Sequence, residues 1–361
     1  MVAETCLLYR NAKRMHYWWR GRMFAADPIL GFAPVPNSRG AEICPVGEIP
    51  VRSDGEGFRI PAGDTDVAAL GPPRAIALGC SFTYGSLCLA EETYLYNLSK
   101  ELDINCVNAG VVSYGLSQIL IRARSLIPRH KPDYVIVQYS PWLVERSQGY
   151  YALGFYVKVP VPYFAESEFD DIYIHYPIFR SKVHELPISG YRGTPKSIAD
   201  FSSFLFNVGL PLYHHDHLNI LIHKIKLVAG VTPRPIADGQ RIVDYVYGEI
   251  GKLCEENRAK MIVVVLGDSV NTKNRHVLDR IPNALVVDAH TALIERLPEP
   301  SEEAYTKAYC HWRGNPPVLV DGHPNARAHR IIALELAKTI RRIRDRPLAQ
   351  PDRVSADATS D

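Results

Sequence analysis

The sequence lacks several features that would define its class directly. No apolar run approaches the ~20 residues that a membrane-spanning helix needs, and the first residues lack the uninterrupted apolar core of a signal peptide. The seven cysteines are odd in number and include no Cys-x-x-Cys pair, which argues against a disulfide framework and against a thiolate zinc site. The net charge of +2 indicates no broad basic surface for nucleic acid. We therefore expect a cytoplasmic protein without a nucleic-acid partner.

The length and composition are those of an ordinary globular protein. A chain of 361 residues, 47% of them hydrophobic, can form one large α/β domain with additions or two small domains. Short apolar segments alternate with helical patterns from residue 74 onward. The predicted strands are 74–78, 104–108, 134–138, 261–266 and 284–287, and the predicted helices are about 91–102, 116–127, 240–257 and 325–342. This alternation predicts a three-layer α/β/α sandwich with a parallel, flavodoxin-like sheet.

Three segments fall outside this alternation. Residues 1–72 precede it, residues 143–235 interrupt it with many Tyr, Phe and Pro residues, and residues 347–361 form a polar tail that we expect to be disordered. We predict an α/β domain over 73–346, in which the aromatic-rich insertion forms a lid or a substrate-facing wall.

The N-terminal segment itself has two parts. Residues 1–24 interleave arginine and lysine with aromatic residues, which fits either a helix on an anionic membrane or partner, or a helix packed on the domain. Residues 25–72 are rich in proline and glycine and predict a non-helical apron of turns and short strands.

A serine stands at the first junction between a predicted strand and a helix. Ser81 lies in the segment Gly79-Cys80-Ser81-Phe82-Thr83-Tyr84-Gly85, directly after the predicted strand 74–78. A serine on such a tight turn exposes its hydroxyl beside backbone N–H groups, which suits a nucleophile if a base can reach it. Near the other end of the chain, Asp321 and His323 lie two residues apart, so an extended segment can point both side chains the same way. The aspartate could then orient the imidazole that deprotonates Ser81.

This pairing of an early serine with a late Asp-x-His resembles the SGNH hydrolases, which include GDSL-type esterases, lipases and acetyltransferases. The resemblance covers roughly residues 74–342. It implies catalysis by Ser81, His323 and Asp321 without a metal or other cofactor. It also implies that the oxyanion is held by the backbone N–H groups of Ser81 and of Ser113, a serine where the family has glycine.

The chain departs from the family pattern at two positions. Cys80 stands where the family usually has aspartate, and it is a second possible nucleophile. Trp142 falls at or near the position of an asparagine that donates the family's third oxyanion hydrogen bond, and Arg146 is another candidate donor. Losing one such donor costs roughly 10²–10³ in rate, which suggests a weakened or repurposed enzyme. We assign Trp142 and Tyr84 to substrate binding.

Two other motifs could mark a functional site. Gly267-Asp268-Ser269 is a more literal Gly-Asp-Ser match than the segment at Ser81, but it follows the fourth strand of the domain instead of the first. His214 and His217 could share one face of a helix as metal ligands, but we interpret them as part of a solvated helix start. We predict no metal site.

The resulting expectation is a serine esterase that removes an O-acyl group, such as acetyl, from a carbohydrate or a small metabolite. An O-acetyltransferase with the same three residues is the alternative enzyme. A non-catalytic module that binds a glycan or another ligand is the alternative from a different class.

Overall fold

The structure is a computed structural model that describes residues 18–44, 46–63, 71–149, 151–152, 159–166, 172–176, 225, 229, 238–268, 272–281 and 284–345. The predictions for His214 and His217, for Ser269 and for the tail lie outside the described residues. Residues 1–17 of the helix expected over 1–24 also lie outside them. In the described remainder the expected helix is wrong, because Trp18–Arg20 is a strand and another strand begins at Phe24.

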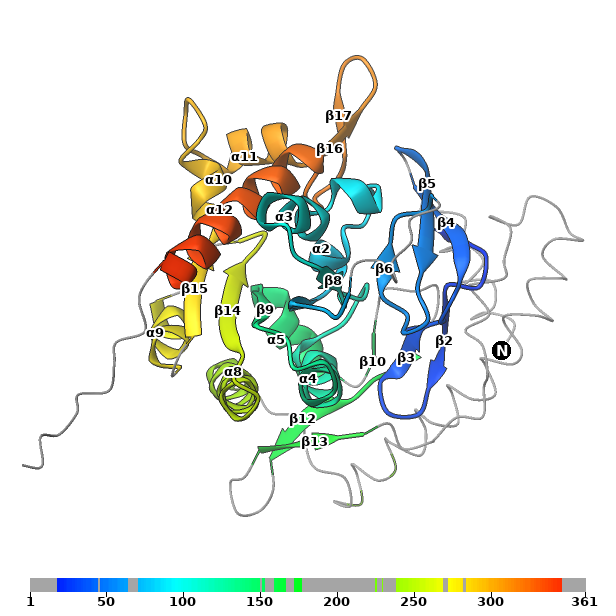
Figure 1. The fold of residues 1–361 in the computed structure, drawn as a ribbon. Helices are drawn as coiled ribbons and strands as arrows, with labels where there is room; N and C mark the ends of the chain where they lie inside the picture. The colour runs from blue at the N-terminus through cyan, green and yellow to red at the C-terminus, as the bar shows by residue number, and fades with distance from the viewer. Residues whose placement is uncertain are drawn as a thin grey trace, which may run out of the picture.

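A parallel sheet forms the centre of the molecule (Figure 1). Its strands, in spatial order, are β8 (Cys106–Asn108), β7 (Ala75–Leu78), β9 (Tyr134–Tyr139), β14 (Lys260–Val265) and β15 (Ala284–Asp288). Neighbouring strands pair in parallel throughout this part. The order is second, first, third, fourth and fifth along the chain, so the predicted flavodoxin-like sheet is confirmed.

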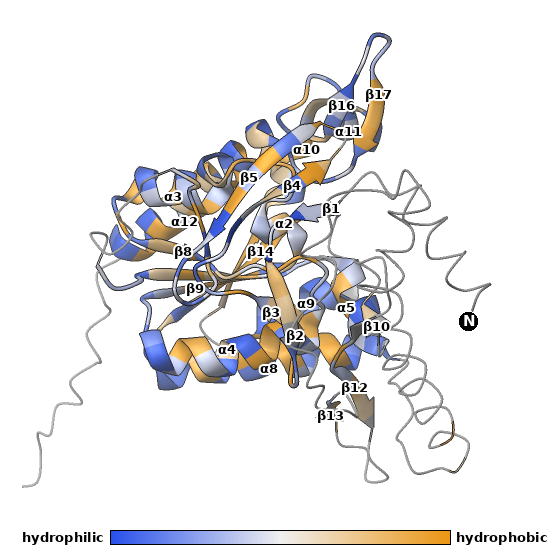
Figure 2. Ribbon diagram, turned by 90° about the vertical axis from the view of Figure 1, so that its right-hand side faces the viewer, coloured by the Kyte–Doolittle hydropathy of each residue, from blue (hydrophilic) through white to orange (hydrophobic). Residues whose placement is uncertain are grey.

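Helices cover both faces of this sheet, which gives the predicted three layers (Figure 2). One face carries α4 (Leu116–His130), α5 (Pro141–Gln148), α8 (Gly239–Glu256) and α9 (Thr272–Arg280). The other carries α3 (Tyr94–Leu102), α10 (Ala289–Ile294), α11 (Glu302–Tyr309) and α12 (Ala326–Asp345).

Alternation along the strands explains why both faces are buried. Within β7, Ile76 and Leu78 belong to the cluster with α4 and α8, whereas Ala75 and Ala77 belong to the cluster with α3 and α12. All four side chains are at most 1% exposed. The near-continuous apolar character that predicted this strand therefore follows from burial on two sides.

Two short helices and a hairpin lie close to the carboxyl ends of the strands. These are α2 (Ser81–Tyr84), the 3-10 turn η2 (Ala90–Glu92) and the hairpin of β16 (His311–Arg313) and β17 (Val318–Asp321). The predicted helix at 91 begins later, at Tyr94, because Thr93 is its N-cap and accepts a hydrogen bond from the Tyr96 N–H.

The N-terminal strands continue the central sheet, beyond the boundary that the sequence predicted at residue 72. Four of them add to its β8 edge in antiparallel fashion, and two form a separate hairpin. The four are β6 (Arg59–Ile60), β5 (Gly47–Ser53), β4 (Arg39–Cys44) and β1 (Trp18–Arg20), and the hairpin is β2 (Phe24–Asp27) with β3 (Gly31–Pro34). Since β6 pairs with β8, the apron shares one nine-stranded sheet with the α/β domain.

The described parts of the predicted insertion are α5 and two small hairpins. The hairpins are β10 (Tyr151–Ala152) with β11 (Val159–Pro160), and β12 (Tyr163–Glu166) with β13 (Ile172–His175). Tyr163 and Phe164 are only 2% and 0% exposed, and the Phe164 ring centroid lies 5.8 Å from that of Tyr245 on α8. For Phe164 the prediction of a substrate-facing wall is wrong, because its ring packs against the helical layer.

No helix among the described segments is both long enough and apolar enough to cross a membrane.

A buried histidine should make the fold sensitive to acid. His329 on α12 is fully buried, its Nδ1 accepts the Tyr94 N–H at 3.2 Å, and burial lowers its pKa from 6.5 to about 3. Between these values the unfolded chain binds a proton that the folded chain does not, so stability falls as pH falls. From pH 6.5 to pH 5.0 we expect this group to remove about 1.5 kcal/mol of unfolding free energy.

Urea unfolding of the His329→Asn variant at both pH values checks this expectation. The variant should lose less stability than the wild-type protein over the interval, whereas His276→Asn, on an exposed part of α9, should lose as much as the wild type. An equal loss in wild type and His329→Asn would contradict the assignment.

Candidate active site

Ser81 lies where β7 gives way to the single turn α2, and Gln138 at the end of β9 holds this junction. Gln138 Oε1 accepts the Cys80 N–H at 2.9 Å and the Thr83 hydroxyl at 2.8 Å. A Cβ on Gly79 would collide with Thr83 Oγ1 and would also lie 2.5 Å from Gln138 Oε1, so glycine is required for this close approach. The junction is therefore fixed by a side chain from the neighbouring strand.

Cys80 is an internal residue. Its side chain is fully buried, and its Sγ lies 3.2 Å from Gln138 Nε2, which donates to it. A thiol in this position cannot meet a substrate, so the structure argues against Cys80 as the nucleophile.

His323 and Asp321 reach Ser81 from the other end of the chain, 242 residues away. His323 Nε2 lies 2.8 Å from Ser81 Oγ, and His323 Nδ1 contacts Asp321 Oδ1. The same carboxylate oxygen accepts the His323 backbone N–H at 2.6 Å, which fixes the two residues relative to each other. The predicted proximity of the serine hydroxyl and the imidazole is confirmed.

The segment that carries this pair is held on both sides. Asn325 donates through Nδ2 to the carbonyls of Ala308 at 3.1 Å and Cys310 at 3.0 Å. Its Oδ1 accepts the Ala328 N–H at 3.1 Å at the start of α12. Because these bonds anchor the chain directly after His323, the imidazole is presented from a rigid support.

The loop after β8 packs against the nucleophile turn, as the family resemblance implies. The Val111 N–H donates to the Gly79 carbonyl at 3.0 Å, and a Cβ on Gly110 would lie 2.6 Å from the Tyr84 nitrogen. Ser113 has φ 62°, in the left-handed region that glycine adopts most easily. This backbone conformation fits a position where the family has glycine.

The ring of Phe82 separates Trp142 from His323. The Phe82 ring centroid is 4.9 Å from that of His323 and 4.9 Å from that of Trp142. A Cβ on Gly267 would collide with the Trp142 indole and approach Phe82, so the turn after β14 packs against the same two rings. Phe82, which the sequence did not single out, is the residue that connects Trp142 to the site.

Tyr84 has a different role from the one predicted. Its side chain is only 4% exposed. The ring centroids of Tyr84 and Trp19 lie 6.0 Å apart in an edge-to-face arrangement, and the Arg59 guanidinium lies 4.5 Å from the Tyr84 centroid. Packed in this way against the N-terminal strands, Tyr84 stabilises α2, and the substrate-binding role predicted for it is not supported.

Gln138 was not predicted as a site residue, although its place in an apolar strand is a signal in the sequence. A glutamine inside the apolar strand Tyr134–Tyr139 has no favourable solvation once buried, so it must find internal partners. Its partners are the groups around Ser81. A polar residue interrupting a predicted buried strand is thus a sequence signal for a site at that strand's end.

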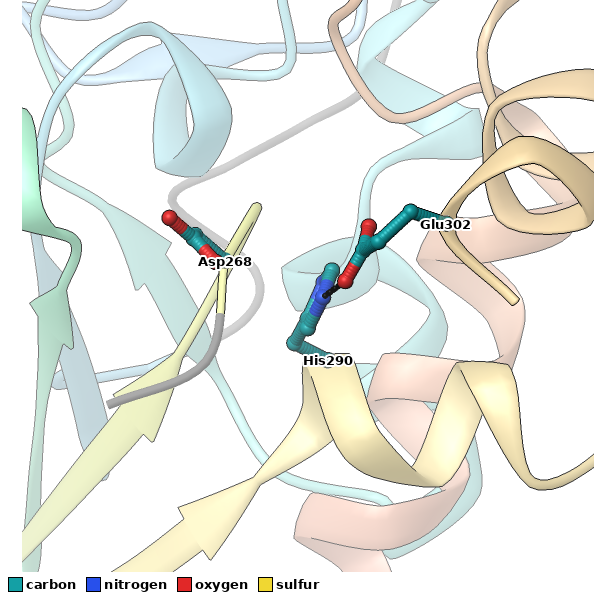
Figure 3. Close-up of side chains that lie close together, drawn as sticks. All are labelled: Asp268, His290 and Glu302. Atoms are coloured by element: carbon teal, nitrogen blue, oxygen red, sulfur yellow. Dashed lines mark hydrogen bonds and ion pairs between the residues drawn. The ribbon is translucent and has the colours of Figure 1, made fainter. Parts of the chain in front are cut away.

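Among the residues whose structure is described, one group of side chains could hold a metal ion (Figure 3). Candidate ligand atoms of Asp268, His290 and Glu302 lie within 4.8 Å of one another, and His290 Nε2 is 3.0 Å from Glu302 Oε1. His290 is fully buried, whereas both carboxylates are exposed. The hydrogen bond between His290 and Glu302 accounts for the proximity of these two side chains without a cation.

Taken together, an α/β sheet presents a serine, a histidine and an aspartate in hydrogen-bonded succession, which is the arrangement of the serine hydrolase catalytic triad.

No protein-family model and no curated protein matches the chain. Solved structures that resemble it include a GDSL-like lipase from Bacteroides thetaiotaomicron, with 11% identity, a TM-score of 0.35 and coverage of 77% of this chain and 95% of that chain. The psychrotrophic esterase EstA from Pseudoalteromonas gives 10% identity, a TM-score of 0.35 and coverage of 75% and 98%. A catalytic mutant of an acetylxylan esterase from Geobacillus stearothermophilus gives 13% identity, a TM-score of 0.36 and coverage of 75% and 94%.

These structures are of the class that the sequence motifs resemble. Their identities and TM-scores are low, so the geometry of the site is the basis for the function of this chain.

Proposed function

We propose that the protein is a serine hydrolase of the SGNH type, which cleaves an O-acyl ester through a covalent acyl-enzyme. The observation that carries the proposal is the alignment of Ser81 Oγ, His323 Nε2 and Asp321 at hydrogen-bonding distances. A serine hydroxyl is a weak nucleophile unless a base accepts its proton, and this alignment supplies the base.

The proposed reaction has two steps. His323 Nε2 takes the Ser81 proton as Oγ attacks the acyl carbon, and the protonated imidazole then gives that proton to the departing alcohol. In the second step His323 takes a proton from water as the water oxygen attacks the acyl carbon. The protonated imidazole then returns that proton to Ser81 Oγ as the bond between Oγ and the acyl carbon breaks and the acid leaves. Asp321 holds the ring through Nδ1 and stabilises its positive charge in both steps.

The negative charge on the acyl oxygen needs hydrogen-bond donors. We assign the backbone N–H groups of Ser81 and Ser113 to this oxyanion hole. The left-handed conformation of Ser113 and the contact of its loop with the nucleophile turn support the assignment.

Labelling with a fluorophosphonate probe followed by mass spectrometry tests the proposal. An activated serine reacts covalently with such a probe, so we expect a single adduct on Ser81. An intact protein without any adduct would contradict the proposal and favour a role in binding a ligand without cleaving it.

We further propose that the substrate carries a small acyl group such as acetyl, linked to a carbohydrate or a small metabolite. The aromatic pair of Phe82 and Trp142 supports this, because it places two large rings next to His323 and so limits the space near the reacting group.

Trp142→Ala tests the acyl-group preference. Removing the indole should open space next to Phe82 and raise kcat/KM for propionate or butyrate esters relative to acetate by about tenfold, as expected for one or two extra methylenes in an apolar pocket. Initial rates on p-nitrophenyl esters of increasing chain length provide the measurement. Trp312→Ala is the matched control, because it removes another indole, that of an exposed tryptophan on β16. It should keep the wild-type dependence of rate on chain length. An unchanged profile in Trp142→Ala would rule out this role.

A further inference from the structure

The helical turn that carries Ser81 needs stabilisation from the rest of the protein. The helix α2 is a single turn of four residues, Ser81–Tyr84, and so short a helix is unstable without tertiary support. Its first residue is the proposed nucleophile, so any movement of the turn moves the hydroxyl relative to His323. The contacts that fix the turn and the segment after it therefore matter for chemistry.

Arg59, which comes from the N-terminal strands, supports the end of this turn and the residues that follow it. Its Nη1 donates to the carbonyls of Tyr84 at 2.7 Å and Gly85 at 2.6 Å, and its Nη2 donates to the carbonyl of Cys88. Only 5% of Arg59 is exposed, and its guanidinium lies over the Tyr84 ring. One buried fork thus binds three carbonyls that lie three, four and seven residues after the nucleophile.

The position of Arg59 in the sheet explains why it reaches these carbonyls. Arg59 on β6 is the register partner of Asn108 on β8, at the point where the N-terminal strands join the parallel sheet. Asn108 Nδ2 donates to the Thr83 carbonyl at 3.0 Å, so both partners of this pair bind the end of α2. Directly opposed residues of antiparallel strands project to the same face, which places both side chains under the turn.

A second N-terminal residue binds the same segment. Glu42 on β4 is 5% exposed and accepts the Leu87 N–H at 3.1 Å. Leu87 has φ 66°, a conformation that a leucine keeps only when its surroundings hold it. Burial raises the pKa of Glu42, while the positive charge of Arg59 acts in the opposite direction.

We propose that Arg59 is a positioning residue for Ser81, and that the N-terminal strands contribute to the active site by supporting the segment that follows Ser81. The inference rests on the proposed function for its catalytic meaning. Arg59 touches neither substrate nor reacting atoms. It fixes residues 84–88, and through them it keeps the Ser81 hydroxyl in line with His323.

The variant Arg59→Lys tests this role with the charge retained. A lysine presents one ammonium in place of a planar fork and cannot bind the three carbonyls in the same directions. We expect kcat for p-nitrophenyl acetate and the rate of fluorophosphonate labelling at Ser81 to fall by about 10–100-fold, the scale of a displacement of about 1 Å at a reacting group. KM should stay close to that of the wild type, because the substrate contacts are unchanged.

Arg52→Lys on β5 is the matched control. Arg52 also donates to a backbone carbonyl, that of Gly63 at 2.9 Å, but it binds no part of the nucleophile segment. It should keep wild-type rates. All rates are measured well below the Tm of each variant, and Arg59→Gln replaces Arg59→Lys if the latter does not fold.

Hydrogen exchange followed by mass spectrometry gives a readout that does not depend on activity. The peptide that spans residues 81–88 should exchange faster in the Arg59 variant than in the wild type or the Arg52 control. Unchanged exchange there, unchanged labelling, or an equal loss in the Arg52 control would overturn the proposal. If the wild-type protein itself takes no label, the proposed function fails, and exchange over residues 81–88 alone decides whether Arg59 holds the turn.

Discussion

Replacement of Ser81 by alanine is expected to lower kcat for ester hydrolysis by about 10⁶, to the level that binding and the oxyanion donors provide alone. The reason is that Ser81 Oγ is the atom that His323 Nε2 contacts at 2.8 Å, so no other group at this position can form the acyl-enzyme. Steady-state rates on p-nitrophenyl acetate measure the loss. Fluorophosphonate labelling of the same variant should disappear.

Ser269→Ala is the matched control for this experiment, because Ser269 stands in the more literal Gly-Asp-Ser sequence. It should retain nearly full activity and full labelling at Ser81. The opposite pattern, with activity lost in Ser269→Ala and kept in Ser81→Ala, would mean that the nucleophile has been assigned to the wrong serine.

His323→Ala should cost about as much as Ser81→Ala, because a serine without its base is no better than an alanine. Asp321→Asn should cost about 10⁴, since an amide in place of the carboxylate no longer favours the ring orientation and charge that the reaction needs. The same ester assay measures both variants, and His276→Ala, an exposed histidine on α9, should keep full activity.

A double variant sharpens this prediction. If Ser81 and His323 act as one unit, Ser81→Ala combined with His323→Ala should be no slower than either single variant. Losses that multiply in the double variant would show that the two side chains act independently, contrary to the arrangement in the structure.

The expected result for Arg59 follows from a feature that local sequence could not reveal. Arg59 lies in Asp54-Gly55-Glu56-Gly57-Phe58-Arg59, which by itself predicts a turn and a short strand. Its partners are carbonyls at positions 84, 85 and 88, and backbone carbonyls carry no signature in a sequence. The function of Arg59 becomes visible only once β6 is paired with β8.

Tyr84 is a second residue whose role the local sequence did not reveal. Its place beside the predicted nucleophile suggested contact with substrate, since residues close in sequence to a reactive group often line the site. In the structure its ring packs against Trp19 and beneath Arg59, both more than 20 residues earlier in the chain. A single helical turn points its residues in all directions, so nearness in sequence did not determine which side Tyr84 faces.

The sequence by itself determined the features that depend on local periodicity and chemistry. Apolar segments that pack on two sides produced recognisable strands, and the residue types Ser, Asp and His, placed after the first strand and on the last loop, predicted the pair that the structure brings to 2.8 Å. Only the tertiary structure decided that the N-terminal strands join the same sheet, that Phe82 connects Trp142 to His323, and that Arg59 and Glu42 support the nucleophile segment. The physical reason is that strand pairing and buried hydrogen bonds join residues far apart in the chain, and the free energy of these contacts depends on geometry that no local pattern specifies.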